Sequence, residues 1–187
     1  DALTMLGDRA FIVRPGLIVG DGDPSDRFGY WAAAFSRAGE EPVLLPPLER
    51  RSAQVIDVDD VAAYIVAATR SGAVNAIGDE HPLAELLQTV REEAGHTGET
   101  VVADEEWLRA HGVAHWAGPL SLPLWLPPEI SGFMTRSNSA FHDSGGHLRP
   151  LADTARRVVA DERVRGVDRE RRAGLTRAQE KALLADR

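Results

Sequence analysis

Cysteine is absent from the 187-residue chain, which excludes disulfide bonds and thiolate chemistry. A chain without disulfides suits a reducing compartment, and its first residues lack the basic segment of a secretory signal, so the sequence predicts a cytoplasmic protein. Every apolar run is shorter than the ~20 residues that a membrane-spanning helix needs. We therefore expect no membrane partner.

Basic residues are also in deficit, with 21 Lys and Arg against 29 Asp and Glu and a net charge of −8. This balance argues against general affinity for nucleic acid. The charge is uneven, because residues 156–187 hold ten basic and six acidic residues and carry +4, leaving −12 for the rest. A basic end could meet an acidic partner, although a solvated helix face is the simpler interpretation.

What the chain does contain is an alternation of strands and helices over its first hundred residues. Short apolar runs predict the strands. They are Phe11–Val19, Val43–Leu45, Gln54–Val58, Ala73–Ile77 and Thr100–Ala103. Alternating strands and helices are typical of an α/β fold in which at least some strands are parallel.

The expected helices have clear start and stop signals. Asp23 followed by Pro24 is typical of a helix start, and Gly39 of an end. Between them, apolar residues share one helical face. They are Phe28, Trp31, Ala32 and Phe35. Asp59 and Asp60 favour the start of a second helix, over Val61–Arg70.

Further helices are expected in the second half of the chain. Pro82 opens a strongly amphipathic one that Gly95 ends. Its apolar face holds Leu83, Leu86, Leu87, Val90 and Ala94. Asp104, Pro150 and the capping-box pair Thr176 and Gln179 begin three more helices. The proline-rich, leucine-rich segment 117–131 reads as an ordered apolar loop.

The strand at Phe11–Val19 is continuous and apolar except for Arg14-Pro15-Gly16. A parallel strand of this kind needs neighbours on both sides and cover on both faces. Only ten residues precede it, too few to supply those neighbours. We therefore expect the chain to be the second half of a larger fold.

Three segments carry a resemblance to a known family: Arg14–Gly20 (RPGLIVG), Val55–Ala62 (VIDVDDVA) and Val74–Gly78 (VNAIG). In this order and spacing they resemble the C-terminal half of extended short-chain dehydrogenase/reductases, the NAD-dependent epimerase/dehydratase family. The resemblance covers almost the whole chain. It implies the C-terminal part of a Rossmann-type parallel sheet plus a smaller α+β substrate-binding domain.

The resemblance also implies a division of the chain. Residues 1–22 and 54–80 would be the remnant of the Rossmann domain. Residues 23–53 and 81–187 would form the substrate-binding domain with its C-terminal helices. The missing N-terminal half would be the main partner, and dimers are common in the family.

The resemblance places NAD or NADP beside the step at Pro15-Gly16, with Leu17 and Ile18 pressing on cofactor or substrate. Proline leaves no N–H to compete, and glycine lets the backbone approach a ring closely. A plain bend without a ligand is the alternative.

A small-molecule substrate would meet the start of the following helix. An arginine there can clamp a carboxylate or phosphate, and aromatic rings can enclose a flat body. The candidate residues are Asp26, Arg27, Phe28 and Trp31. The alternative is a surface Asp-Arg pair beside a core tryptophan.

The chain departs from the family in three respects. Neither Gly20–Gly22 nor Gly95–Gly98 forms a glycine-rich turn between a strand and a helix. The family's catalytic tyrosine, with a lysine four residues later, has no counterpart, because alanine follows both Tyr30 and Tyr64 at that distance. Ala53 occupies the position where nucleotide-sugar members often have an arginine.

These departures leave no catalytic residue in the chain, and we expect it to be inactive alone. The whole protein would be an NAD(P)-dependent oxidoreductase or epimerase. A non-catalytic NAD(P)-binding sensor or scaffold of the same fold is the main alternative. An independent binding module is a third, against which the missing sheet neighbours argue.

Metal binding is not expected. Asp57, Asp59 and Asp60 form an acidic cluster, but two of them are placed to cap a helix. His111 and His115 have a spacing that suits zinc, but Gly112 interrupts the helix and no third ligand is evident.

Overall fold

The computed structural model describes residues 2–187, with side chains for residues 4–130 and 132–187. The apolar run after the N-terminal turns α1 (Ala2–Leu6) and η1 (Gly7–Arg9) divides into β1 (Phe11–Pro15) and β2 (Leu17–Val19). The break falls at Gly16, as the sequence predicts. The two strands join different sheets, so the chain changes partners at this step.

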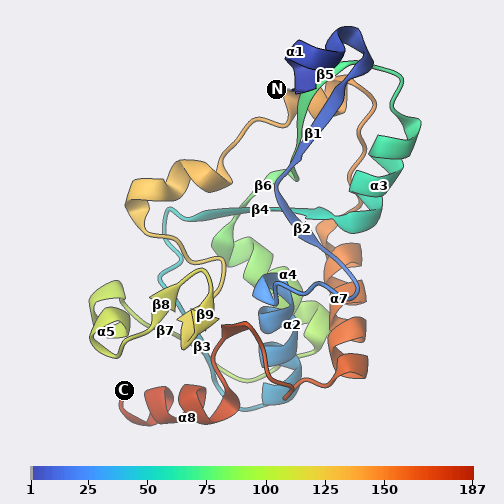
Figure 1. Ribbon diagram of the computed structural model, residues 1–187. Coiled ribbons are helices and arrows are strands. Elements are labelled where there is room, and N and C mark those ends of the chain that lie inside the picture. The colour runs from blue at the N-terminus through green and yellow to red at the C-terminus, as the bar shows by residue number, and fades with distance from the viewer. Residues whose placement is uncertain (1) are drawn as a thin grey trace.

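The strands around the break confirm the α/β prediction. β1 pairs in parallel with β5 (Gly72–Ala76), and β2 pairs in parallel with β4 (Ser52–Asp57). β4 also pairs antiparallel with β6 (Glu80–Pro82). In Figure 1, β4 crosses the middle of the molecule, with β1, β5 and α3 (Val58–Ala67) above it.

Shorter strands lie in the lower part of the molecule. β3 (Val43–Leu45) pairs in parallel with β7 (Thr100–Val102). The segment 117–131, expected to be an ordered apolar loop, contains two two-residue strands, β9 (Gly118–Pro119) and β10 (Ser121–Leu122). β10 pairs with β8 (Ala114–His115), and β9 pairs with β11 (Ala173–Gly174). The second pairing ties the loop to the C-terminal region.

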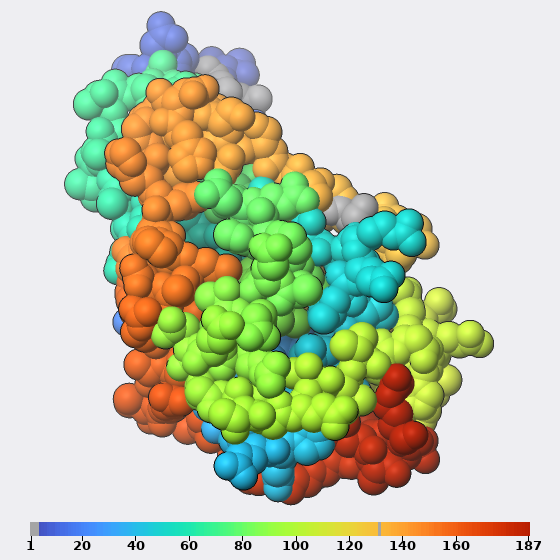
Figure 2. All heavy atoms as spheres, turned by 180° about the vertical axis from the view of Figure 1, so that it is seen from behind, coloured from blue at the N-terminus to red at the C-terminus, as the bar shows by residue number. Residues whose placement is uncertain are grey.

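Three helices pack against one another below β4: α2 (Arg27–Ala38), α4 (Leu83–Ala94) and α7 (Leu151–Arg165). Figure 2 shows α4 and α7 side by side on the rear face. Residues Phe28 to Phe35 of α2 are all buried, so this helix is covered on every side rather than on one apolar face. The small side chains of Ala32, Ala33 and Ala34 allow this close packing.

Two helix starts differ from the prediction. α2 begins at Arg27, not Pro24, because the Asp23 carboxylate accepts hydrogen bonds from the backbone and hydroxyl of Ser25 and closes a turn first. α3 begins at Val58, and its cap is Asp57, which accepts from the Asp59 N–H at 2.9 Å. Asp59 and Asp60 therefore lie in the first turn, where their charge favours the helix dipole.

α3 also ends at Ala67, before the predicted Arg70, whereas the following local signals are confirmed. α4 ends at Gly95, and its five predicted apolar residues are all buried. Asp104 caps α5 (Glu105–Ala110) through the Trp107 N–H, and the Thr176 and Gln179 capping box begins α8 (Arg177–Ala185). The remaining helices are η2 (Pro128–Met134) and α6 (Ser139–Asp143). Among the described residues, every helix is too short or too polar to cross a bilayer.

The buried apolar side chains form two clusters. The larger one lies around α2, α4 and α7. The smaller one joins α3, β4 and β5 to α6 and comprises Ile56, Val61, Tyr64, Val74, Ala76 and Phe141. Assignment of residues 1–22 and 54–80 to a cofactor domain stays a prediction, since the smaller cluster also draws Phe141 from beyond those limits.

Candidate functional site

A cavity of about 290 Å³ opens where the chain passes from β1 to β2. This segment supplies Arg14, Pro15, Gly16 and Leu17 to the cavity wall. The rest of the wall is Arg27, Gln54, Asn75, Ile77, Trp116, Phe133, Met134 and Arg136. Six separate parts of the sequence therefore meet at the break in the strand.

The Pro15-Gly16 break between β1 and β2, which we call the strand step, packs against β5 and against Ile77, the residue after β5. The Gly16 N–H donates to the Ala76 carbonyl at 3.1 Å, and a Cβ on Gly16 would lie 3.1 Å from Ile77 Cγ2. Glycine thus lets the chain pass close to Ile77. Pro15 and Gly16 are themselves exposed, so their backbone edge is open to a ligand.

Arginine and aromatic side chains alternate along the cavity. The Arg27 guanidinium lies 5.0 Å from the Trp116 ring centroid, and the Arg136 guanidinium lies 5.2 Å from that of Phe133. The two rings meet edge to face, 5.5 Å apart. Each guanidinium is thus oriented by a ring in an attractive cation–π contact.

The cavity is positively charged. Among the described residues, the guanidinium groups of Arg14, Arg27 and Arg136 make no ion pair with a carboxylate, and the buried Nε of Arg27 has no hydrogen-bond partner. The same is true of the Nε atoms of Arg37, Arg51, Arg169 and Arg171, so the unpaired nitrogen does not by itself mark a ligand site.

Gln54 fixes one wall of the cavity. Its Oε1 accepts from the Arg136 N–H at 2.9 Å, and its Nε2 donates to the carbonyls of Arg136 at 2.8 Å and Gly78 at 3.1 Å. Sequence reasoning treated Gln54 only as a strand residue. The available signal was a polar side chain in an otherwise apolar strand, because a buried amide needs partners.

The predicted site residues are brought together only in part. Pro15, Gly16, Leu17 and Arg27 line the cavity, whereas Ile18 packs beside the smaller core. Phe28 and Trp31 are fully buried in the larger core, and the Trp31 Nε1–H donates to the Pro123 carbonyl at 2.9 Å. Which of these residues contacts a ligand stays a prediction.

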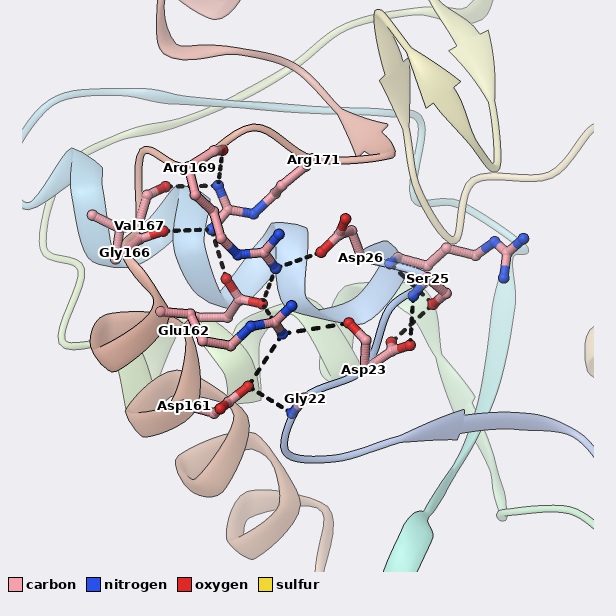
Figure 3. Close-up of polar contacts among 12 residues, drawn as sticks. Gly22, Asp23, Ser25, Asp26, Asp161, Glu162, Gly166, Val167, Arg169 and Arg171 are labelled. Carbon is pink, nitrogen blue, oxygen red and sulfur yellow. Dashed lines mark hydrogen bonds and ion pairs between the residues drawn. The ribbon is translucent and has the colours of Figure 1, made fainter.

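Asp26 belongs to an ionic network that we call the arginine clamp. The clamp consists of Asp26, Glu162, Arg165, Arg169 and Arg171. Figure 3 labels all of these residues except Arg165. Glu162 accepts from Arg171 at 2.6 Å, Arg169 at 2.8 Å and Arg165 at 3.3 Å. Asp26 accepts from Arg169 and from the Arg172 N–H. The clamp joins the loop after α7 to the residue just before Arg27.

The clamp refines the interpretation of the basic C-terminal segment. Arg165, Arg169 and Arg171 pair with partly buried or buried carboxylates of the chain itself. The exposed Arg156, Arg177 and Lys181 agree with the expected solvated helix face. Glycine makes the pairing of Glu162 possible, since a Cβ on Gly29 would lie 2.5 Å from Glu162 Oε1. The buried Glu162 can therefore reach the start of α2.

The clamp also perturbs Asp26. Burial by itself raises the pKa of the Asp26 carboxyl. The hydrogen bonds from Arg169 and the Arg172 N–H outweigh burial, so this pKa lies below its ordinary value. Asp26 is therefore a charged structural anchor and not a proton donor near neutral pH.

The acidic and histidine residues that were considered as metal ligands contact other side chains of the protein. Asp57 accepts from the Thr154 hydroxyl at 2.9 Å, and Asp59 pairs with Arg157 at 2.6 Å. His111 pairs with Asp186 at 2.8 Å, while His115 faces Glu105 at 3.8 Å. Within residues 4–130 and 132–187, no three His, Asp or Glu side chains are grouped as a metal site requires.

Neither tyrosine has a catalytic arrangement. Tyr30 is buried in the larger core, and the Tyr64 hydroxyl lies 2.6 Å from Ser144 Oγ. The sequence contains one lysine, Lys181, and its side chain pairs with Glu41 on the surface. The described residues thus contain no Tyr–Lys pair.

No protein-family model matches the chain, and no curated protein is significantly similar to it. Solved structures do match. Pseudomonas aeruginosa RMD, complexed with NADPH, superposes with a TM-score of 0.60 at 16% identity, covering 88% of this chain and 52% of RMD. Thermotoga maritima UDP-glucose 4-epimerase, with UDP-glucose, gives 0.57 at 16% identity, covering 83% and 46%.

A GDP-L-fucose synthetase from Naegleria fowleri, bound to NADP, gives a TM-score of 0.56 at 12% identity and covers 81% of this chain and 44% of the synthetase. The chain therefore spans about half the length of these structures. At such low identity the comparison shows a shared fold: the chain has the fold of about half of each of these proteins.

Proposed function

We propose that the chain is the substrate-side half of an NAD(P)-dependent oxidoreductase or epimerase. Pro15, Gly16, Leu17 and Ile18 would contact the nicotinamide end of the cofactor, and Arg27 would contact the substrate. The observation that carries the proposal is the cavity at the Pro15-Gly16 step, in a fold similar to complexes with NADPH and NADP. Residues 1–22 and 54–80 would serve the cofactor, and the rest of the chain the substrate.

The residues present fit one end of a dinucleotide. The exposed backbone at Pro15 and Gly16 can approach a ring, and Leu17, Ile77 and Met134 offer an apolar surface beside it. The glycine-rich turn that would bind the pyrophosphate is not in this chain. The cofactor, when bound, supplies hydride chemistry. The residues of this chain bind the substrate, orient it and exclude water.

Binding of nicotinamide mononucleotide tests the cofactor contact, because this molecule lacks the adenosine half that the rest of the fold would bind. We expect backbone amide NMR signals of Gly16, Leu17 and Ile18 to shift on titration. Gly16→Ala should reduce the shifts, since its Cβ crowds Ile77. Val66→Ala, a change at an exposed residue of α3, should leave them intact. Shifts absent from Gly16–Ile18, or unchanged in Gly16→Ala, would refute the contact.

A turnover assay tests the proposal that the catalytic residues lie in another part of the protein. The chain has no Tyr–Lys pair, so it should oxidise no NADH or NADPH above the blank with a panel of ketones. Measurable oxidation would place the proton donor within this chain. The same binding without turnover is expected of a sensor or scaffold, and a Tyr–Lys pair in the sequence preceding this chain would favour the enzyme.

A further inference from the structure

We propose that the cavity at the Pro15-Gly16 step binds a planar organic anion. Its carboxylate or phosphate would lie among Arg14, Arg27 and Arg136, and its flat body against Trp116 and Phe133. This inference rests on the proposed function, because it names the substrate class of the same site.

The cavity concentrates positive charge. Arg14, Arg27 and Arg136 bring three positive charges to one cavity of about 290 Å³, although the chain as a whole carries −8. In the clamp, by contrast, Glu162 neutralises the neighbouring arginines. The arginines of the cavity have no such partner among the described carboxylates, and an oxyanion would supply it.

The position of Arg27 at the cavity is fixed by its surroundings. Arg27 is the first residue of α2, and the clamp fixes the residue before it. The stacked Trp116 restricts the plane of its guanidinium. Its donors are therefore oriented before a ligand binds, which lowers the entropic cost of binding.

An aromatic pair lies beside these charges. Phe133 is 49% exposed and is the aromatic ring among the exposed large apolar side chains of the described residues. Trp116 has a φ of 67°, a left-handed conformation that is strained for a bulky residue and that is enriched at ligand sites. The backbone thus keeps an aromatic surface beside three cations, which fits a ligand that is both flat and anionic.

The site differs from the phosphate contact of nucleotide-sugar enzymes. Ala53, which stands where such enzymes often have arginine, is fully buried and lines none of this cavity. An anion at Arg14, Arg27 and Arg136 therefore uses other residues.

The test measures the affinities of small probes for the chain by calorimetry, without cofactor. The probes are cinnamate, phenyl phosphate, neutral cinnamyl alcohol and inorganic phosphate. We expect cinnamate or phenyl phosphate to bind about tenfold or more tightly than cinnamyl alcohol and inorganic phosphate. Arg27→Gln and Arg136→Gln should each weaken that binding by about tenfold. Arg70→Gln, an exposed arginine after α3, is the matched control and should bind normally.

The outcomes separate the possibilities. If cinnamate binds more tightly than phenyl phosphate, the substrate is a carboxylate. If phenyl phosphate binds more tightly, the substrate is a phosphorylated compound. Equal binding of cinnamyl alcohol, equal binding of inorganic phosphate, or normal affinity in both arginine variants overturns the proposal. Arg136 is exposed, so its variant remains informative if Arg27→Gln does not fold. Nicotinamide mononucleotide also carries a phosphate and a flat ring, so its titration is repeated in Arg27→Gln and Arg136→Gln. Shifts at Gly16 that persist in both variants are assigned to the cofactor contact, which then stands if the proposal made here fails.

Discussion

The Asp26 carboxylate accepts a hydrogen bond from the Arg169 guanidinium, 143 residues later in the chain. Asp26 is 4% exposed and has a φ of 59°, which a non-glycine residue adopts at some cost. The contact, with that of the Arg172 N–H, holds the turn from which α2 begins. The end of the chain therefore determines where Arg27 enters the cavity.

Arg169→Gln should destabilise the protein by about 3 kcal/mol, because it leaves the buried Asp26 without its charged partner and removes one donor from Glu162. Urea unfolding monitored by tryptophan fluorescence measures the change. Arg156→Gln is the control, since Arg156 is largely exposed on α7 and its pairs contribute little. Equal stability of the two variants would show that the clamp is dispensable.

The clamp also predicts a pH dependence. The folded-state pKa of Asp26 lies below the ordinary 3.8, so in the window between the two values the unfolded state binds more protons. The contribution of Asp26 is thus present above pH 3.8 and is lost as the pH falls through the lower folded-state value. The stability difference between wild type and Asp26→Asn, from urea unfolding at several pH values, should shrink below about pH 4. A difference that grows on acidification contradicts this assignment.

The fold was largely predictable because its signals are local. Gly39 and Gly95 end helices where expected, and Asp104 and Thr176 cap the helices that follow them. Such signals act within a few residues. The start of α2 was misplaced because Asp23 satisfies a turn as readily as a helix cap.

Only the part of the candidate site that lies at a local bend of the chain could be predicted from the sequence. The Pro15-Gly16 step is visible in the sequence, but its neighbours Trp116, Phe133 and Arg136 come from distant segments. Their approach depends on contacts such as Gln54 with Arg136, 82 residues apart, which no local pattern encodes. Burial of Phe28 and Trp31 likewise follows from α4 and α7 covering α2 on its other sides.

Gly174→Ala should be strongly destabilising. A Cβ there would lie 2.0 Å from Cδ2 of the buried Tyr30, and the residue has a φ of 110°. Overpacking and strain together should cost about 3 kcal/mol in urea unfolding. Gly72→Ala isolates the backbone effect, because Gly72 has a φ of 93° with open space around it, and should cost about 1 kcal/mol. Similar losses in both variants would mean that Tyr30 moves aside.

Gln54→Leu should loosen the cavity wall without changing its charge. Leucine keeps the volume but leaves the Arg136 N–H and carbonyl and the Gly78 carbonyl without their partner. Native-state hydrogen exchange should show the Arg136 amide exchanging about tenfold or more faster, since its hydrogen bond to Gln54 Oε1 is lost. Gln88→Leu is the matched control on the exposed face of α4, where the amide contacts only Glu92, and should leave the Arg136 amide protected. Unchanged protection in Gln54→Leu would mean that the ring of Phe133, stacked against Arg136, is enough to hold the wall.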